Sequence, residues 1–177
     1  FKPGDFRSGY YRDQTFMLAS GICTVEQYFA QLYSDPSKEN DPFSAGRQMN
    51  AHFVTKNVDE NGEWLDLANQ KNTSSDMAPT ASQMPRALGL ALASKLFRSV
   101  DALKEFKNLS NNGNEICFCT IGDASTSEGH FWETVNAAGV LQVPLAVFVW
   151  DDGYGISVPK KYQTTKGSIS EALSGMQ

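Results

Sequence analysis

The sequence predicts an α/β fold in which helices flank a parallel sheet. Residues 115–121 and 144–150 are short apolar runs typical of buried strands, and residues 127–141 between them have a helical pattern. Two strands joined by one helix predict a parallel pair with a right-handed crossover. An acidic segment with glycine follows each strand, so we expect both segments at the carboxyl edge of the sheet, where open α/β sheets bind ligands.

Helices are expected in four further regions. Thr24-Val25-Glu26-Gln27 has the form of a capping box and predicts a helix that continues to about Ser34. Residues 82–97 repeat apolar side chains at helical spacing, and residues 100–106 predict a short helix after them. The fourth helix is expected to begin within residues 168–176.

The two predicted strands are too few, because two strands do not make a stable sheet. We therefore expect another strand at about Tyr11–Leu18, together with sheet-completing elements outside the chain. The segment from Ser37 to about Pro79 is polar and predicts no regular structure. Loops of this length in a compact domain tend to be functional or to pack on a partner.

Size and charge exclude several classes of protein. The 177 residues have the length of one domain, and the hydrophobic content of 41% is ordinary for a globular protein. Fifteen basic and twenty acidic residues give a net charge of −5, which argues against a nucleic-acid partner. No apolar run reaches the roughly 20 residues of a membrane span, and no signal peptide is visible. We expect a cytoplasmic protein with no membrane partner.

The chain begins with Phe1 rather than Met. We therefore expect a fragment that is truncated at both ends. Whether a targeting segment precedes it stays open.

The three cysteines, Cys23, Cys117 and Cys119, are expected to be reduced thiols. An odd count without framework spacing argues against a set of disulfides. Cys117 and Cys119 lie two residues apart on a predicted strand and therefore share one face. A metal or redox pair is the alternative, but free cysteine in a buried apolar run behaves as a small hydrophobic residue.

Asp123 and Asp152 are the candidate metal ligands, because each follows a predicted strand. Carboxylate oxygens are the ligands that Mg²⁺ prefers, and the free N–H groups at the start of the crossover helix suit a phosphate. The alternative for Asp123 is a helix N-cap. The alternative for Asp151-Asp152-Gly153 is a plain turn.

The same segments resemble a known motif. Gly122-Asp123, an intervening helix and strand, and Asp152-Gly153 are similar to the thiamine-diphosphate motif, which usually has Gly-Asp-Gly and then Asn-Asn. The surrounding segments resemble, in order, the α subunits of 2-oxo acid dehydrogenase E1 components. They are Tyr11-Arg12-Asp13, Gly46-Arg47-Gln48-Met49 with His52, Ala81-Ser82-Gln83-Met84-Pro85, Ser125-Thr126-Ser127-Glu128-Gly129, Asn136-Ala137-Ala138 and Asp152-Gly153-Tyr154-Gly155-Ile156-Ser157.

This resemblance spans most of the chain and implies a thiamine-diphosphate-binding fold, incomplete here. Residues 1–177 would be one domain that forms the diphosphate-binding part. The implied metal ligands are Asp123, Asp152 and the backbone carbonyl of Tyr154. The implied cofactor-binding residues are Tyr11, Arg12, Thr80, Gly122, Asp123, Ala124, Ser125, Asp152 and Tyr154.

Individual roles also follow from the resemblance. Tyr11 and Arg12 would reach the diphosphate, and backbone groups near Thr80 would contact the aminopyrimidine. The alternative for Arg12 is a surface salt bridge to Asp13. His52 matches a histidine near the active-site entrance and is the candidate catalytic residue; the alternative is an ordinary polar histidine in a loop.

The chain departs from the family pattern at three places. Ala124 replaces the second glycine of the motif, which is tolerable if its φ is negative. Asp151-Asp152 replaces Asn-Asn, which keeps oxygen ligands but adds negative charge near a diphosphate. Ala78 stands where relatives often carry serine, so a side-chain contact with the cofactor is lost.

The resemblance implies a thiamine-diphosphate- and Mg²⁺-dependent E1 component. Such an enzyme decarboxylates a 2-oxo acid, of the branched-chain 2-oxoisovalerate type or pyruvate, and passes the acyl group to a lipoyl-bearing E2. The glutamate that activates the cofactor comes from a β subunit in this family, and nothing in this chain matches it. We therefore expect a β-like partner subunit or a fused downstream region, and an oligomer.

Two alternatives to this function stay open. The first is another thiamine-diphosphate enzyme, of the transketolase or acetoin dehydrogenase type. The second is a non-catalytic assembly module that has lost the cofactor.

Overall fold

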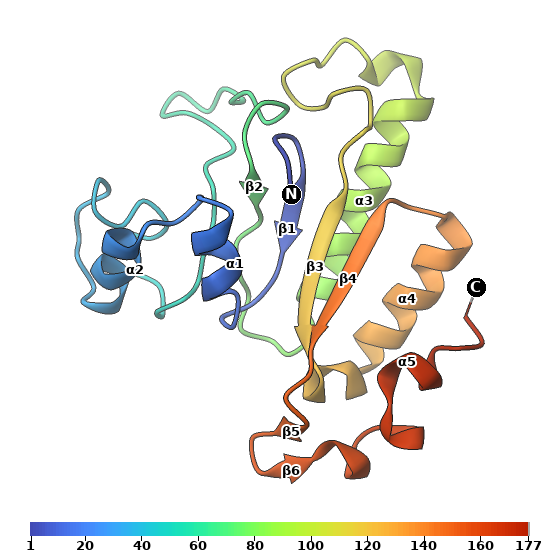
Figure 1. The fold of residues 1–177 in the computed structure, drawn as a ribbon. Coiled ribbons are helices and arrows are strands. Elements are labelled where there is room, and N and C mark those ends of the chain that lie inside the picture. The colour runs from blue at the N-terminus through green and yellow to red at the C-terminus, as the bar shows by residue number, and fades with distance from the viewer. Residues whose placement is uncertain (177) are drawn as a thin grey trace.

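The structure is a computed structural model that describes residues 1–176. Four parallel strands form one sheet in the order β2-β1-β3-β4, and helices flank it (Figure 1). The predicted α/β class with a parallel sheet is therefore confirmed. The strands are β1 (Phe6–Ser8), β2 (Asn72–Thr73), β3 (Cys117–Gly122) and β4 (Leu145–Trp150).

Five α-helices accompany the sheet in the described part of the chain. They are α1 (Gln14–Ala19), α2 (Val25–Leu32), α3 (Gln83–Ser99), α4 (Gly129–Leu141) and α5 (Ile169–Ala172). The predicted capping box of α2 is confirmed, because Thr24 Oγ1 accepts from Gln27 N at 3.2 Å and Gln27 Oε1 accepts from Thr24 N at 3.0 Å. After β4 the chain forms a small hairpin of β5 (Tyr154–Gly155) and β6 (Val158–Pro159).

The main core lies between the sheet and the two long helices α3 and α4. Alternate residues of β3, Cys117, Cys119 and Ile121, point into it, as the period of two in a strand requires. Ala87 and Ala91 of α3 are fully buried there, and their small side chains let the helix approach the strands closely. This core packs α3 and α4 against the strands β3 and β4.

The three cysteines are free and buried, which confirms the expected reduced thiols. Burial raises the pKa of the Cys23 thiol to about 11 and that of Cys117 to about 12. Burial also raises the pKa of Cys119. Because the thiolate is the reactive form, all three act as small hydrophobic residues near neutral pH.

A buried ionic network, the Arg7 network, ties the sheet together at its carboxyl edge. Arg7 of β1 is fully buried and lies 2.7 Å from Asp13 Oδ2 and 2.9 Å from Asp76 Oδ1. Each of the other three strands contributes one residue. Thr73 Oγ1 of β2 accepts from Arg7 Nη1 at 2.8 Å. The Thr120 hydroxyl of β3 donates to Asp13, and Trp150 Nε1 of β4 donates to Asp13 Oδ1 at 2.8 Å. One arginine and two carboxylates therefore connect all four strands.

The predicted strand at Tyr11–Leu18 is wrong, because this region contains most of α1. Met17 of α1 is fully buried in a second, smaller core together with Cys23 and Phe53. The apolar side chains of this segment therefore form the buried face of a helix and not one face of a strand. The additional strands are β1, which lies just before that segment, and β2. β2 falls within residues 37–79, which were predicted to have no regular structure.

Several boundaries also differ from the prediction. β3 begins at Cys117 rather than at residue 115, and α4 begins at Gly129 rather than at residue 127. A 3-10 turn over Ala124–Ser127 precedes α4, and Glu128 between them is extended. Helix is confined to Asp101–Leu103 within the predicted region 100–106, and to the four residues of α5 within 168–176.

β4 is an edge strand of the sheet in the described residues. Its six residues are all apolar, and Phe148 and Trp150 are exposed on the face away from α3 and α4. Across residues 1–176, no helix has both the length and the apolar character that crossing a membrane requires.

Candidate functional site

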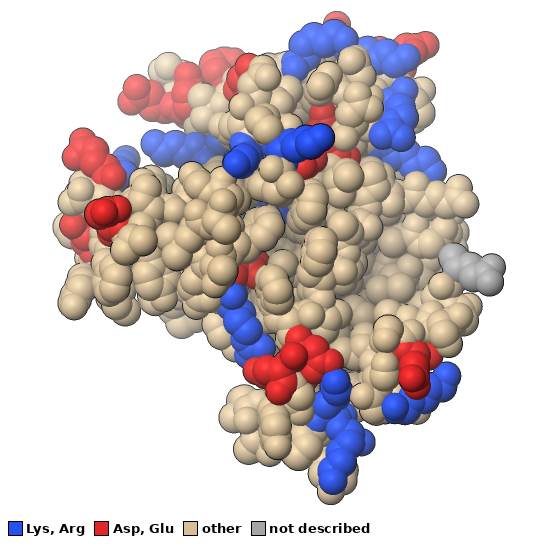
Figure 2. Space-filling model, viewed as in Figure 1, with Lys and Arg blue, Asp and Glu red and all other residues tan. Residues whose placement is uncertain are grey.

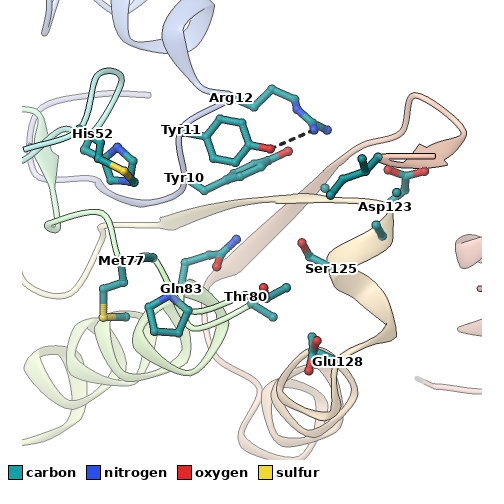
Figure 3. Close-up of a pocket in the computed structure, with 18 of the residues that line it drawn as sticks. Tyr10, Tyr11, Arg12, His52, Met77, Thr80, Gln83, Asp123, Ser125 and Glu128 are labelled. Carbon is teal, nitrogen blue, oxygen red and sulfur yellow. Dashed lines mark hydrogen bonds between the residues drawn. The ribbon is translucent and has the colours of Figure 1, made fainter. Parts of the chain in front are cut away.

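A cavity of about 690 Å³ opens at the carboxyl edge of the sheet (Figure 3). The turn after β1, the segment before α3 and the turn after β3 surround it, because parallel strands deliver their following loops to the same edge. Nine of the ten predicted site residues line it: Tyr11, Arg12, His52, Thr80, Gly122, Asp123, Ala124, Ser125 and Tyr154. Asp152 is the one that does not.

Asp123 lines one end of this cavity, directly after β3. The residue is only 2% exposed, yet neither carboxylate oxygen has a hydrogen-bond partner within residues 1–176. Asp123 occupies the N-cap position of the 3-10 turn that follows, but its side chain makes no capping hydrogen bond there. Burial raises the pKa of Asp123, and the nearby charges of Asp151 and Asp152 raise it further, although the backbone N–H groups of Ala124 and of Asp123 itself oppose the shift. Such a carboxylate is short of positive charge.

Asp151 and Asp152 follow β4 and complete an acidic cluster with Asp123. Asp151 forms an ion pair with Lys160 and accepts from Gly153 N at 3.0 Å. Asp152 Oδ2 lies 3.6 Å from Arg12 Nη1, and its Oδ1 accepts from Tyr154 N at 3.1 Å. Figure 2 shows acidic side chains gathered near this end of the molecule, with basic side chains beside them.

Arg12 is the cation that faces the cavity. Its Nη2 donates to Tyr11 Oη at 3.3 Å, and its guanidinium lies over the rings of Tyr10 and Tyr11 (Figure 3). The alternative, a surface salt bridge from Arg12 to Asp13, is wrong, because the buried Asp13 forms its ion pair with Arg7. The Arg12 side chain is 38% exposed. Its guanidinium presents several N–H donors in one plane at the mouth of the cavity, which suits a phosphate group.

The departure at Ala124 fits the packing. Ala124 lies in a 3-10 turn and is not among the residues with positive φ, so no glycine is needed there. The opposing residue is Gly155, where an added Cβ would lie 2.7 Å from Ala124 Cβ. The methyl group of Ala124 therefore fills space that Gly155 leaves open.

His52 lies at the other end of the cavity from Asp123 (Figure 3). It is 7% exposed, and its Nδ1 lies 3.1 Å from the backbone oxygen of Asn50. A protonated Nδ1 would donate to that oxygen, which leaves Nε2 free for a ligand. His52 lies in a loop, so the alternative of an ordinary polar loop histidine stays open. Thr80 lies below, in the segment that leads into α3.

The cavity also contains residues that the sequence interpretation missed. They include Tyr10, Asn50, Gln83 and Gln163. Gln83 belongs to a segment quoted for the resemblance, which could have marked it, and its Nε2 donates to the Thr120 carbonyl at 3.1 Å. For Tyr10 the only sequence signal was its place beside Tyr11-Arg12.

The described residues contain no group of three His, Cys, Asp or Glu side chains arranged to hold a metal ion. The predicted ligand set has only two carboxylates and a carbonyl, so it falls outside that pattern. Such a set would leave several of the six positions of Mg²⁺ for ligand oxygens and water.

Comparisons with known proteins agree with this arrangement. The family model of the dehydrogenase E1 component matches residues 1–176. The chain is 31% identical over 171 residues to the 2-oxoisovalerate dehydrogenase subunit alpha of Bacillus subtilis, covering 97% of this chain and 42% of that protein. The corresponding mitochondrial subunit of Caenorhabditis elegans is 30% identical (92% of this chain, 30% of that protein), and the human one 26% (90% and 28%).

The chain thus spans less than half the length of these relatives. The family model nevertheless covers almost every residue, including the two acidic segments that meet at the carboxyl edge. This chain therefore belongs to the dehydrogenase E1 component family.

Proposed function

We propose that this chain is the diphosphate-binding, α-like part of a thiamine-diphosphate- and Mg²⁺-dependent E1 component. The observation that carries the proposal is the buried Asp123 carboxylate, which faces a cavity and has no partner among residues 1–176. A divalent cation would supply the missing charge. The acidic oxygens suit a hard cation and Arg12 suits an anion, so the residues present fit a cation and a diphosphate together.

Each residue has a role in this proposal. Asp123, Asp152 and the backbone carbonyl of Tyr154 would hold Mg²⁺, while Arg12 would offset the negative charge of the diphosphate. When bound, thiamine diphosphate supplies the electron sink for decarboxylation of a 2-oxo acid. His52, at the far end of the cavity, would exchange a hydrogen bond or a proton with the substrate.

The relatives support a substrate class. Those named above are 2-oxoisovalerate dehydrogenase alpha subunits, so a branched-chain 2-oxo acid is proposed first and pyruvate second. The partners proposed are a β-like region, which supplies the activating glutamate, and a lipoyl-bearing E2. A cytoplasmic location stays part of the proposal.

Calorimetric titration tests the cofactor assignment. The E1 assembly that contains this chain is titrated with thiamine diphosphate in the presence and absence of Mg²⁺. We expect saturable binding that requires Mg²⁺. Absence of binding with Mg²⁺ present would favour the non-catalytic assembly module, although the packing of Ala124 against Gly155 gives that alternative no support.

A second assay tests the two-part site. Release of carbon dioxide from 2-oxoisovalerate and from pyruvate is measured for residues 1–177 alone and for the chain with its β-like region. We expect activity only in the second case, since copies of this chain all lack the activating glutamate. Turnover of about 1 per second or more by the isolated chain would refute the proposal.

A further inference from the structure

Besides the Asp123 carboxylate, the hydroxyl of Tyr10 and the Oδ1 of Asn50 are buried polar atoms of this cavity that have no partner within residues 1–176. Tyr10 is 8% exposed, and its Oη has no hydrogen-bond partner within residues 1–176. Figure 3 shows the rings of Tyr10 and Tyr11 close together, with their hydroxyl ends toward the side that holds Arg12 and Asp123. An unsatisfied buried hydroxyl costs stability, so its place at a cavity wall points to a ligand.

The backbone explains why this hydroxyl is held in place. The Tyr10 carbonyl accepts from Arg7 Nη2 at 3.1 Å and from Asp13 N at 3.1 Å, so the Arg7 network fixes the turn after β1. Gly9 permits the turn, because a Cβ there would lie 2.0 Å from Asp13 Oδ2. The ring is therefore positioned by the buried Arg7 network.

Space in front of the hydroxyl is kept open by Gly122. A Cβ added at Gly122 would lie 3.2 Å from Tyr10 Oη and 3.5 Å from Arg12 Nη1. A side chain at this position would occupy the volume between the hydroxyl, the guanidinium and the start of the acidic cluster. That volume adjoins the cation proposed at Asp123.

Tyr10 is a hydrogen-bond donor at neutral pH. Burial raises the pKa of its hydroxyl, and the nearby Arg12 lowers it only in part. The Arg12 guanidinium lies over the ring, 5.7 Å from its centre, and is near enough to the hydroxyl to oppose the rise of its pKa. Tyr11 differs, because it is 50% exposed and its hydroxyl already accepts from Arg12.

We propose that Tyr10 donates a hydrogen bond to a diphosphate oxygen of the cofactor, and that it does so more strongly than Tyr11. The identity of the cofactor rests on the proposed function, but the donor assignment rests on the buried hydroxyl and the open space at Gly122. A neutral donor suits this place, since it binds phosphate oxygen without competing with Mg²⁺ for the acidic cluster.

The test compares hydroxyl deletions in the E1 assembly that contains this chain. Affinities for thiamine diphosphate, inorganic diphosphate and thiamine are measured by calorimetry with Mg²⁺ present, for the unmodified protein and for Tyr10→Phe, Tyr11→Phe and Tyr162→Phe. Phenylalanine keeps the ring, and thermal melting verifies folding. Tyr162 is exposed and lies outside the cavity, so it is the matched control.

We expect Tyr10→Phe to weaken thiamine diphosphate and inorganic diphosphate by a similar factor, about tenfold or more, as for a hydrogen bond to a charged group. Thiamine binding should not change, Tyr11→Phe should lose less, and Tyr162→Phe should lose nothing. Unchanged diphosphate affinity in Tyr10→Phe overturns the assignment, and so does an equal loss for thiamine. If inorganic diphosphate binds in a Tyr10-dependent way but thiamine diphosphate does not bind, the donor assignment stands and the proposed function fails.

Discussion

Two groups of carboxylates lie at the same edge of the sheet in opposite surroundings. In the Arg7 network, one cation serves Asp13 and Asp76 and contacts both directly. In the acidic cluster, Arg12 and Lys160 stand beside three carboxylates, yet neither reaches the buried oxygens of Asp123. With Arg7 counted in the first group, and Arg12 and Lys160 in the second, each group has a formal charge of −1 when all these side chains are ionised. The difference is therefore not the net charge but whether a cationic side chain reaches the buried carboxylate.

This contrast separates structure from function. A buried carboxylate that meets its cation inside the fold holds strands together. A buried carboxylate that meets no cation inside the fold can bind one from solution. Four substitutions test the contrast, in decreasing order of expected effect.

Arg7→Met should have the largest effect on folding. It leaves Asp13 and Asp76 buried without a cation, which costs about 3–5 kcal/mol of the free energy of unfolding. Denaturant unfolding measures the change. Lys104→Met removes an exposed ion pair with Asp101 and should leave the midpoint almost unchanged. Equal midpoints for the two variants would show that the network is not structural.

Asp123→Ala should affect binding instead of folding. Loss of a charged ligand should weaken Mg²⁺-dependent binding of thiamine diphosphate by about 100-fold or more. Without Mg²⁺ the variant should melt near the temperature of the unmodified assembly, since the Asp123 carboxylate pairs with no cation within residues 1–176. Calorimetry and melting curves measure the two quantities. Full cofactor affinity in this variant would place the metal elsewhere.

Asp152→Asn should have a smaller effect. The amide keeps an oxygen ligand and removes a negative charge near the diphosphate, so cofactor affinity should change by less than about tenfold. Steady-state decarboxylation by the E1 assembly measures the outcome. Complete loss of activity in a folded variant would contradict the role proposed for this carboxylate.

Asp76→Asn should remove the part of the pH dependence of stability that Asp76 contributes. Burial raises the pKa of Asp76, although Arg7 opposes the shift. The folded state therefore holds the proton more tightly, so this contribution to stability is present below about pH 4 and is lost as pH rises through the raised pKa. Unfolding free energies across this range should show that loss in the natural chain and not in the variant.

The matched control has the opposite sign. The hydrogen bond from Lys104 lowers the pKa of Asp101, so its contribution is lost as pH falls. Asp101→Asn should therefore remove a loss of stability that occurs as pH falls, whereas Asp76→Asn removes one that occurs as pH rises. Parallel pH curves for the natural chain and Asp76→Asn would contradict the assigned shift.

The predictable part of the fold was the unit of β3, α4 and β4. Its strands are continuous apolar runs and its helix has a clear period, so local patterns were sufficient. β1 and β2 were not predicted, because they have only three and two residues and include polar side chains such as Arg7 and Asn72. Those residues are buried by contacts from distant segments, which a local pattern does not contain.

The candidate site shows the same division. The motif resemblance marked residues that the fold then brings to one cavity, including Arg12, Thr80 and Asp123. Tyr10 was missed because the burial of its hydroxyl depends on the turn after β1 and on the space at Gly122. Whether the marked residues bind the cofactor stays a prediction that the titrations above address.

The edge position of β4 has a consequence for handling the protein. A six-residue strand without charge or proline, unpaired along one side in the described residues, is a template for adding strands from other chains. Residues 1–177 produced alone should therefore aggregate through this edge at high concentration. A lysine at exposed Phe148 should delay that aggregation, as charged side chains on natural edge strands do.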